Sequence, residues 1–285
     1  MDMTNILFAV LVLGVMGGVF GLVLAIASKV FAVETDPRLP EIMDCLAGAN
    51  CGGCGYPGCG GCADAILSGK APVNACPPAG AEGAAKIAAI MGVEMTVSEK
   101  MVAAVKCNGG SRAVKKFEYR GVEDCLGALK VGAGPLECGY GCLGFGSCVK
   151  ACAFDAIHIN DRGVAEVDRD KCTNCMACAG VCPRKLIISV PEASSVLVPC
   201  ASKDKGVAAK AACDVSCIGC KLCEKNCPTG AITVTDNIAS IDYSKCTSCG
   251  MCIGKCPRKL IVDVNGKITP ETAPKPAPAA PAAKA

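Results

Sequence analysis

Sets of closely spaced cysteines constrain this chain more than any other feature of its sequence. Cysteine accounts for 26 of the 285 residues, whereas aromatic residues make up 4% and tryptophan is absent. A chain with so few large side chains to fill a core needs cross-links, either disulfides or metal clusters, to hold its cysteine-rich part together. The spacing of the cysteines distinguishes these two possibilities.

Two runs of cysteines near the C-terminus share one regular spacing. Three cysteines are separated by two residues each, and a fourth follows after three more, directly before a proline: Cys217, Cys220, Cys223 and Cys227, then Cys246, Cys249, Cys252 and Cys256. This is the spacing of bacterial ferredoxins, in which three thiolates wrap one iron–sulfur cluster and the fourth binds its neighbour. The crossing predicts one [4Fe–4S] cluster on Cys217, Cys220, Cys223 and Cys256, and another on Cys246, Cys249, Cys252 and Cys227.

A second unit of this kind lies earlier in the chain. Its latter half repeats the last run, at Cys172, Cys175, Cys178 and Cys182, and Pro183–Ile187 matches Pro257–Ile261 residue by residue. Its first half is a variant with wider gaps, at Cys138, Cys142, Cys148 and Cys152, and its glycines allow a looser loop. The same crossing predicts one cluster on Cys138, Cys142, Cys148 and Cys182, and the next on Cys172, Cys175, Cys178 and Cys152.

A separate four-cysteine set precedes both units, at Cys51, Cys54, Cys59 and Cys76. The glycines between Gly52 and Gly60 free the backbone to fold around an inorganic core. A structural zinc site uses four thiolates in the same way and is the alternative. The density of glycine and the recurrence of four-cysteine sets along the chain favour another iron–sulfur cluster, the fifth.

Six cysteines remain outside these sets. Cys107 and Cys200 each end a strand-like run, and Cys125 and Cys213 each end a helical stretch. We interpret these two strand–helix halves as packing together to hold a sixth cluster; free buried thiols or zinc ligands are the alternatives. Cys45 and Cys62 have no matching partners, and we expect them to be small buried residues.

Other functions find little support in the sequence. Secreted disulfide domains reach this cysteine density, but cysteines two residues apart make poor cross-links for a fold. The net charge of +3 does not indicate nucleic-acid binding, and the one histidine, His158, has the pattern of an exposed strand residue. Gly139–Gly144 matches a dinucleotide fingerprint but lies inside a ligand loop. We therefore expect no catalytic residue in this chain.

An apolar segment without a charge, Ile6–Ala27, lies near the N-terminus. About 20 apolar residues span a membrane as a helix, so the segment predicts a transmembrane anchor. A cleaved signal peptide is the alternative, although Met1–Asn5 carries no positive charge. Lys29 and Arg38 follow the segment, and the positive-inside rule then predicts that everything after Lys29 lies in the cytoplasm.

These features predict an α+β chain made of seven segments. They are 1–34, a transmembrane anchor; 35–92, a four-cysteine iron–sulfur domain; 93–137, a strand–helix segment; 138–190, a first ferredoxin module; 191–213, a second strand–helix segment; 214–265, a second ferredoxin module; and 266–285, a disordered tail rich in proline and alanine. Within them we expect strands at 101–106 and 195–199, and helices at 82–91, at 205–212 and at the start of 111–124.

Along nearly its whole length the chain resembles the B subunits of Rnf complexes (RnfB, also called RsxB). The resemblance rests on the N-terminal apolar segment, then Gly48–Cys59 (GANCGGCGYPGC) with Cys76, then the tandem ferredoxin modules. The segments KCNGG, ECGYGCLGFGSCVKAC and PCASKDKG resemble the longer B subunits of anaerobic bacteria. The family implies Cys51, Cys54, Cys59, Cys76 and the ferredoxin cysteines as ligands, and leaves the role of Cys45 and Cys62 open.

The resemblance implies an electron-transfer subunit of a membrane complex that oxidises reduced ferredoxin, reduces NAD and transports Na⁺ or H⁺. Partner subunits would supply the flavin and NAD sites, and soluble ferredoxin would be the donor. A polyferredoxin adaptor or cluster carrier outside any ion pump is the alternative. Basic pairs follow the two regular runs, Arg184–Lys185 and Arg258–Lys259, and are expected to tune clusters, to attract an acidic ferredoxin, or to form solvated turns.

Overall fold

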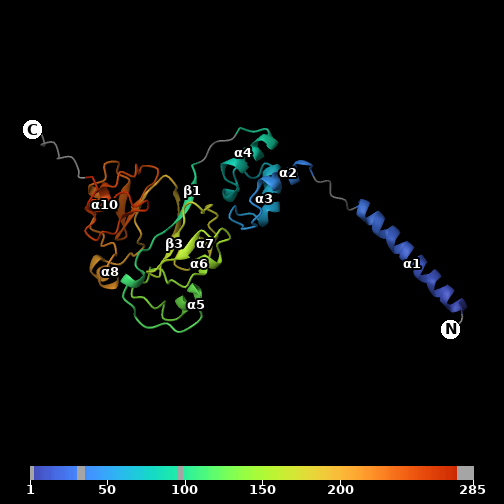
Figure 1. Cartoon of the computed structure of the whole chain (residues 1–285), viewed down its shortest axis with the longest axis horizontal. Helices are drawn as coiled ribbons and strands as arrows, with labels where there is room; N and C mark the ends of the chain where they lie inside the picture. The colour runs from blue at the N-terminus through green and yellow to red at the C-terminus, as the bar shows by residue number, and fades with distance from the viewer. Residues whose placement is uncertain (1–2, 31–35, 95–98, 275–285) are drawn as a thin grey trace, which may run out of the picture. The chain divides into compact units, whose positions relative to one another are not determined.

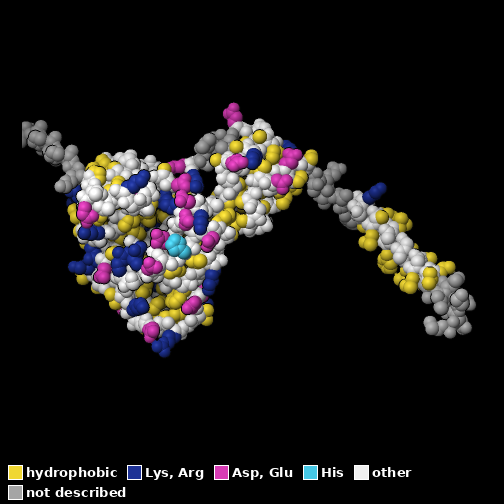
Figure 2. Space-filling model, in the orientation of Figure 1, with side chains coloured by type: hydrophobic (Ala, Val, Ile, Leu, Met, Phe, Trp, Pro, Cys, Tyr) yellow, Lys and Arg dark blue, Asp and Glu magenta, His cyan; other side chains and the backbone are white. Residues whose placement is uncertain are grey.

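The computed structural model describes residues 3–30, 36–94 and 99–274, within two compact units, Met1–Glu41 and Ile42–Ala285. The first unit is dominated by helix α1 (Met3–Val30), which covers the predicted span (Figure 1). Its mean hydropathy over Val10–Lys29 is 2.6, and apolar side chains such as Leu13, 70% exposed, lie open along it (Figure 2). A helix that is apolar all round requires a lipid or protein environment, so α1 is a candidate membrane span.

Short helices form the next part of the chain. They are α2 (Arg38–Cys45), α3 (Gly58–Leu67), the 3₁₀ turn η1 (Pro77–Ala79) and α4 (Gly80–Met91). Each α-helix buries one large aliphatic side chain, Ile42, Ile66 or Ile87, at most 1% exposed. Helix α4 stops at Gly92, whose φ of 66° is the left-handed conformation that glycine adopts freely, and this confirms the predicted end of the helix.

Within the described residues, four two-stranded antiparallel sheets organise the cysteine-rich part. The pairs are β1 (Met101–Val105) with β4 (Ile187–Pro191), β2 (Ile157–Ile159) with β3 (Ala165–Val167), β5 (Val196–Leu197) with β8 (Val262–Asp263), and β6 (Ile232–Thr235) with β7 (Ile238–Ile241). In each half, the strand that precedes the ferredoxin-like unit pairs with the strand that ends it. The duplication read from the cysteines therefore extends to the strand pairing.

The strand–helix segments are only partly as predicted. Strands β1 and β5 and helix α8 (Gly206–Ala212) confirm three predicted elements. The helix expected at the start of 111–124 is wrong: a 3₁₀ turn, η2 (Gly110–Arg112), is followed by extended chain, and α5 (Cys125–Lys130) begins at Cys125. The reason is tertiary pairing, because Ala113 bridges to Cys213 and Lys115 to Leu136.

Each ferredoxin-like unit has its own apolar core and two one-turn helices, α6 (Ser147–Lys150) and α7 (Ala177–Gly180) in the first, α9 (Leu222–Lys225) and α10 (Met251–Lys255) in the second. The most buried core residues, at most 2% exposed, are Val102, Val164, Leu186 and Val190 in one core and Val196, Ala239, Ile253, Leu260 and Ile261 in the other. The small cores agree with the scarcity of aromatic residues.

The second core extends into the predicted tail. Ile268 and Ala273 pack against it, and the N–H of Ala273 donates to the carbonyl of Thr269 at 2.9 Å. The chain is therefore structured beyond the predicted boundary at 265, because these side chains find apolar surface to cover. The remainder of the predicted tail, 275–285, lies outside the described residues.

Candidate metal centres

The ligand loops share one backbone conformation. The third cysteine of each run is the second residue of a one-turn helix: Cys148 in α6, Cys178 in α7, Cys223 in α9 and Cys252 in α10. The residue before each helix has a positive φ: 71° at Gly146, 59° at Met176, 60° at Lys221 and 74° at Gly250. A left-handed residue here turns the loop sharply, so that cysteines before and after the turn can line one hollow.

Three hollows in the two units are each lined by four cysteines. The sets are Cys152, Cys172, Cys175 and Cys178; Cys217, Cys220, Cys223 and Cys256; and Cys125, Cys142, Cys148 and Cys182. The free space between their walls, including the part open to solvent, is about 340, 370 and 380 Å³ respectively. The first two sets are the groupings that the crossing of the fourth cysteine predicts.

The third hollow differs from the predicted grouping, since Cys125 lines it in place of Cys138. Cys142 and Cys148 keep the spacing of the first and third cysteines of a regular run, and Phe145 stands at the second position. The ring of Phe145 packs edge-on against Tyr119, with centroids 5.1 Å apart, on the segment leading to Cys125. Cys125 thus supplies from outside the loop the thiol that the loop lacks.

A hydrogen-bond network fixes Cys125 beside α6. Asp124 caps α5 by accepting from the N–H of Gly127 at 2.9 Å, and it also accepts from the Ser147 hydroxyl at 2.8 Å. The Ser147 hydroxyl in turn accepts from the N–H of Cys125 at 2.8 Å. The bonds from Gly127 and Ser147 hold the pKa of Asp124 below its usual value. Helices α5 and α6, which carry Cys125 and Cys148, are thereby tied together.

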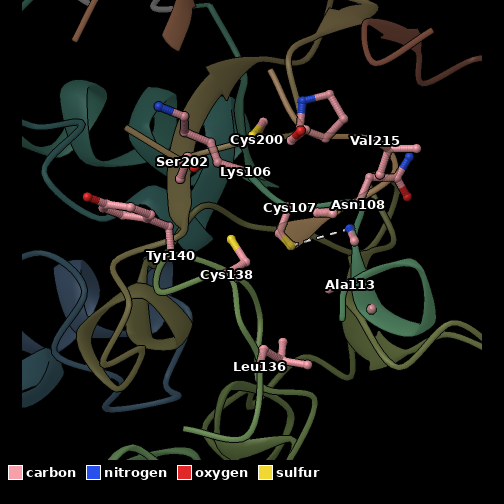
Figure 3. Close-up of a pocket in the computed structure, with 17 residues that line it drawn as sticks. Lys106, Cys107, Asn108, Ala113, Leu136, Cys138, Tyr140, Cys200, Ser202 and Val215 are labelled. Carbon is pink, nitrogen blue, oxygen red and sulfur yellow. Dashed lines mark hydrogen bonds between the residues drawn. The ribbon is translucent and has the colours of Figure 1, made fainter. Parts of the chain in front are cut away.

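A fourth hollow joins the two halves of the duplicated part, and we name it the bridging site (Figure 3). It is lined by Cys107, Cys138, Cys200 and Cys213, with free space of about 380 Å³. The sequence predicts Cys125 here, but Cys138 takes its place. Leu136 packs with Ala113 and Cys213, and this contact brings Cys138 to the bridging site.

The other predicted sets are described in part. Cys246 and Cys249 lie close to Cys252, and Cys54 and Cys59 lie close to Cys76. The carbonyl of the Asn50 side chain accepts from the N–H of Cys59 at 2.8 Å and so fixes the start of α3. For Cys227, burial raises the pKa, but bonds from the Thr229 hydroxyl and from backbone N–H groups outweigh it and leave the pKa lowered.

Cys62 and Cys45, which belong to no predicted four-cysteine set, differ in burial. Cys62 is 1% exposed, as expected of a small buried residue, and burial together with the nearby Cys54 raises its pKa to about 12. Cys45 is only half-buried, at the end of α2. His158 is exposed on β2 opposite Glu166, as predicted.

Backbone amides point at the cysteine sulfurs. The N–H groups of Ala156, Leu186 and Leu260 donate to the Sγ atoms of Cys152, Cys182 and Cys256 at 3.4, 3.5 and 3.4 Å, each from four residues further on. In addition, the N–H of Ala103 donates to Cys172 Sγ at 3.3 Å. Such donors favour the thiolate over the thiol, and hydrogen bonds to sulfur are one determinant of cluster potential.

Burial raises the pKa of many of these thiols, to about 12 for Cys148 and Cys252 and to about 11 for Cys178, Cys200 and Cys223. On their own they would be protonated at neutral pH and poor nucleophiles. A bound metal deprotonates a coordinating thiol outright and removes this obstacle. The buried cysteines therefore suit metal ligation better than thiol chemistry.

The arrangement fits a polynuclear cluster better than a single ion. Within 3–30, 36–94 and 99–274, no three His, Cys, Asp or Glu side chains are grouped to hold one metal ion. A zinc site needs its sulfurs about 2.3 Å from one centre, whereas a [4Fe–4S] cluster spreads four thiolates around a larger core. None of the 26 cysteines, all of which lie in the described ranges, is in a disulfide, and four hollows are each lined by four of them.

Comparison with known families assigns the same chemistry. A family model described as an Fe-S cluster matches residues 46–78, and one described as a 4Fe-4S dicluster domain matches residues 136–186 and 216–260. The first range contains the set from Cys51 to Cys76, and the other two cover the ferredoxin-like units. The chain therefore combines an Fe–S domain, two dicluster ferredoxin domains and one N-terminal apolar helix.

Curated relatives match most of the chain. It is 45% identical over 254 residues to the B subunit of the ion-translocating oxidoreductase complex of Methanosarcina acetivorans, covering 89% of this chain and 96% of that protein. It is 48% identical over 257 residues to the B subunit of the Na⁺-translocating ferredoxin:NAD⁺ oxidoreductase complex of Acetobacterium woodii, covering 90% and 77%. The proton-translocating counterpart from Clostridium ljungdahlii is 43% identical over 263 residues, covering 91% and 93%. The chain belongs to the B-subunit family of Rnf-type ion-translocating oxidoreductase complexes.

Proposed function

We propose that this chain relays electrons within a membrane-bound ion-translocating ferredoxin:NAD oxidoreductase. The names of the relatives from A. woodii and C. ljungdahlii state that activity for their own complexes. The observation that carries the proposal is the four-cysteine hollow, which occurs four times in the described part of the chain with free space of 340–380 Å³. When bound there, [4Fe–4S] clusters supply one-electron transfer without a change of ligands.

Six sets of cysteines would hold these clusters. They are Cys51, Cys54, Cys59 and Cys76; Cys125, Cys142, Cys148 and Cys182; Cys152, Cys172, Cys175 and Cys178; Cys107, Cys138, Cys200 and Cys213; Cys217, Cys220, Cys223 and Cys256; and Cys227, Cys246, Cys249 and Cys252. Three hollows in the ferredoxin-like units and the bridging site support four of the sets. The other two rest on ligand spacing and on the family models.

The bridging site connects the two modules of the proposed relay. The N–H of Cys142, from one module, donates to Cys107 Sγ at 3.3 Å, and the N–H of Cys217, from the other, donates to Cys200 Sγ at 3.5 Å. Cys142 and Cys217 hold the first ligand position of their loops. Each module therefore places a ligand residue one hydrogen bond away from the bridging site, which makes this site the junction of the relay.

The apolar helix α1 is the basis for the proposed location and partners of the chain. Helix α1 would hold the chain in the membrane, with Lys29 and the cysteine-rich part on the cytoplasmic side. Reduced ferredoxin, a soluble cytoplasmic protein, would be the donor. Flavin and NAD would bind to partner subunits of the complex. The transported ion is Na⁺ for the A. woodii relative and the proton for the C. ljungdahlii relative.

The experiment is a redox titration of the full chain in its membrane complex, followed by EPR, with reduced ferredoxin then used as the donor. We expect several clusters that are reduced reversibly at low potential, and their reduction by ferredoxin before NADH appears. Clusters that leave the protein for an apo-acceptor and are not reduced by ferredoxin would contradict the proposal and indicate a cluster carrier.

A further inference from the structure

Two arginines occupy equivalent positions in the two ferredoxin-like units. Arg184 and Arg258 each lie two residues after the fourth cysteine of a regular run, and each is followed by a lysine, Lys185 or Lys259. The lysines are exposed, whereas both arginines are half-buried. The duplicated basic pair is therefore not simply a solvated turn, since one member of each pair is directed into the protein.

Arg184 lies between one module hollow and the bridging site. It lines the hollow of Cys125, Cys142, Cys148 and Cys182, and its Nη2 donates to the carbonyl of Ala133 at 2.6 Å. Its Nη1 is 3.7 Å from the point that a Cβ on Gly139, next to Cys138, would occupy. Burial lowers the pKa of Arg184, and the charged forms of Cys138 and Cys182 oppose this effect.

Arg258 has the corresponding place in the other module. It lines the hollow of Cys217, Cys220, Cys223 and Cys256. Its guanidinium donates to the carbonyl of Cys213 at 3.1 Å and also to the carbonyl of Asp214. Cys213 is a wall residue of the bridging site. Each arginine thus contacts one module hollow and the chain segment that brings a cysteine to the bridging site.

Both guanidinium groups keep a buried donor without a protein acceptor. Among the described residues, the Nε atoms of Arg112, Arg184 and Arg258 are buried and have no hydrogen-bond partner. A buried unpaired donor of a charged group is costly, so native proteins usually provide an acceptor. Apart from Ser147 in one hollow and Lys221 in the other, the side chains that line the two hollows beside these arginines belong to cysteines and apolar residues. A cluster with its anionic sulfurs would supply the missing acceptor.

We propose that Arg184 and Arg258 raise the reduction potentials of the clusters on either side of the bridging site. Reduction adds a negative charge to a cluster, and a fixed cation close by stabilises that charge, most strongly where water is excluded. The inference rests on the proposed cluster assignment.

The test compares Arg184→Gln and Arg258→Gln with the matched controls Lys185→Gln and Lys259→Gln, which remove the same charge one residue away at the surface. Each full-length variant is titrated by EPR, and its iron content is measured in parallel. We expect each arginine variant to make reduction of at least one cluster about tenfold less favourable, a shift of about 59 mV to lower potential. We expect the lysine variants to shift by less than a third of that.

Arg184→Lys and Arg258→Lys separate the effect of charge from an effect on folding, because lysine keeps the positive charge but lacks the planar guanidinium group. With full iron content, we expect these variants to retain most of the wild-type potential. Unchanged potentials in Arg184→Gln and Arg258→Gln, or equal shifts in the arginine and lysine positions, would overturn the inference while leaving the relay intact. A wild-type chain without reversible low-potential clusters would overturn the proposed function itself, and this inference with it.

Discussion

Tertiary packing decides which hollow Cys125 and Cys138 each line. Cys125 lies far along the chain from Cys142 and Cys148, yet it lines the same hollow through the contact between Tyr119 and Phe145. Cys138 follows Leu136, which packs with residues of the other half of the duplication. Single side chains outside the ligand loops therefore decide which four cysteines line one hollow.

This grouping predicts a specific pattern of non-additivity. Cys125→Ser and Cys142→Ser should each remove one cluster, about four iron atoms per chain, and the double variant should lose no more than either single variant. Cys125→Ser combined with Cys107→Ser should lose about eight, because these thiols serve different clusters. The measurement is iron per chain. Additive losses for the first pair and shared loss for the second would restore the grouping expected from sequence.

The ligands that sequence predicts well are those set by local spacing. Cys220 lines the hollow of its own loop, where Gly219 and Lys221 have a positive φ, so a run of three cysteines predicts its own geometry. The exchange of Cys125 and Cys138 depends on contacts between distant segments, and spacing alone carries no record of these. One signal was present in the sequence, since Phe145 stands in register where a regular run has its second cysteine.

Among the elements, α5 shows how a short helix delivers a ligand. The extended segment before it is held by the pairing of Lys115 with Leu136, and this pairing overrides the helical preference expected from sequence. The helix then begins at Cys125, capped by Asp124 and joined through Ser147 to α6. A six-residue helix has little stability of its own, so its cap and its tertiary contacts decide its position.

Removing that cap should loosen one cluster selectively. Asp124→Ala leaves the N–H of Gly127 and the Ser147 hydroxyl without their acceptor, so Cys125 loses its fixed position. We expect the cluster on Cys125, Cys142, Cys148 and Cys182 to be lost faster in oxygenated buffer, with a half-life reduced severalfold. Glu123→Gln, an exposed neighbour, is the control. The visible absorbance and EPR signals follow the loss, and equal half-lives in both variants would contradict this role for Asp124.

At the scale of the whole molecule, the chain is a duplicated pair of ferredoxin-like units that meet at one shared site. Cys107 and Cys138 come from the first half and Cys200 and Cys213 from the second, with β1 and β5 leading to Cys107 and Cys200. Neither half could complete the bridging site alone. The duplication was evident from the sequence, whereas the membership of the bridging site required the structure.

The membrane orientation gives a prediction at this scale. With the basic residue Lys29 at the end of α1, the cysteine-rich part should face the cytoplasm. A protease-sensitive tag fused after Ala285 should be cleaved in inverted membrane vesicles and protected in right-side-out vesicles. The opposite pattern of cleavage would place the iron–sulfur part outside the cell and exclude soluble ferredoxin as its donor.

The content of iron and acid-labile sulfide in the purified full-length chain distinguishes six clusters from five. Six [4Fe–4S] clusters require about 24 of each per polypeptide. The other five cysteine sets account for about 20 of each, and the bridging site accounts for the remaining four. About 24 of each would support a continuous relay through both modules, and about 20 would contradict a cluster at the bridging site.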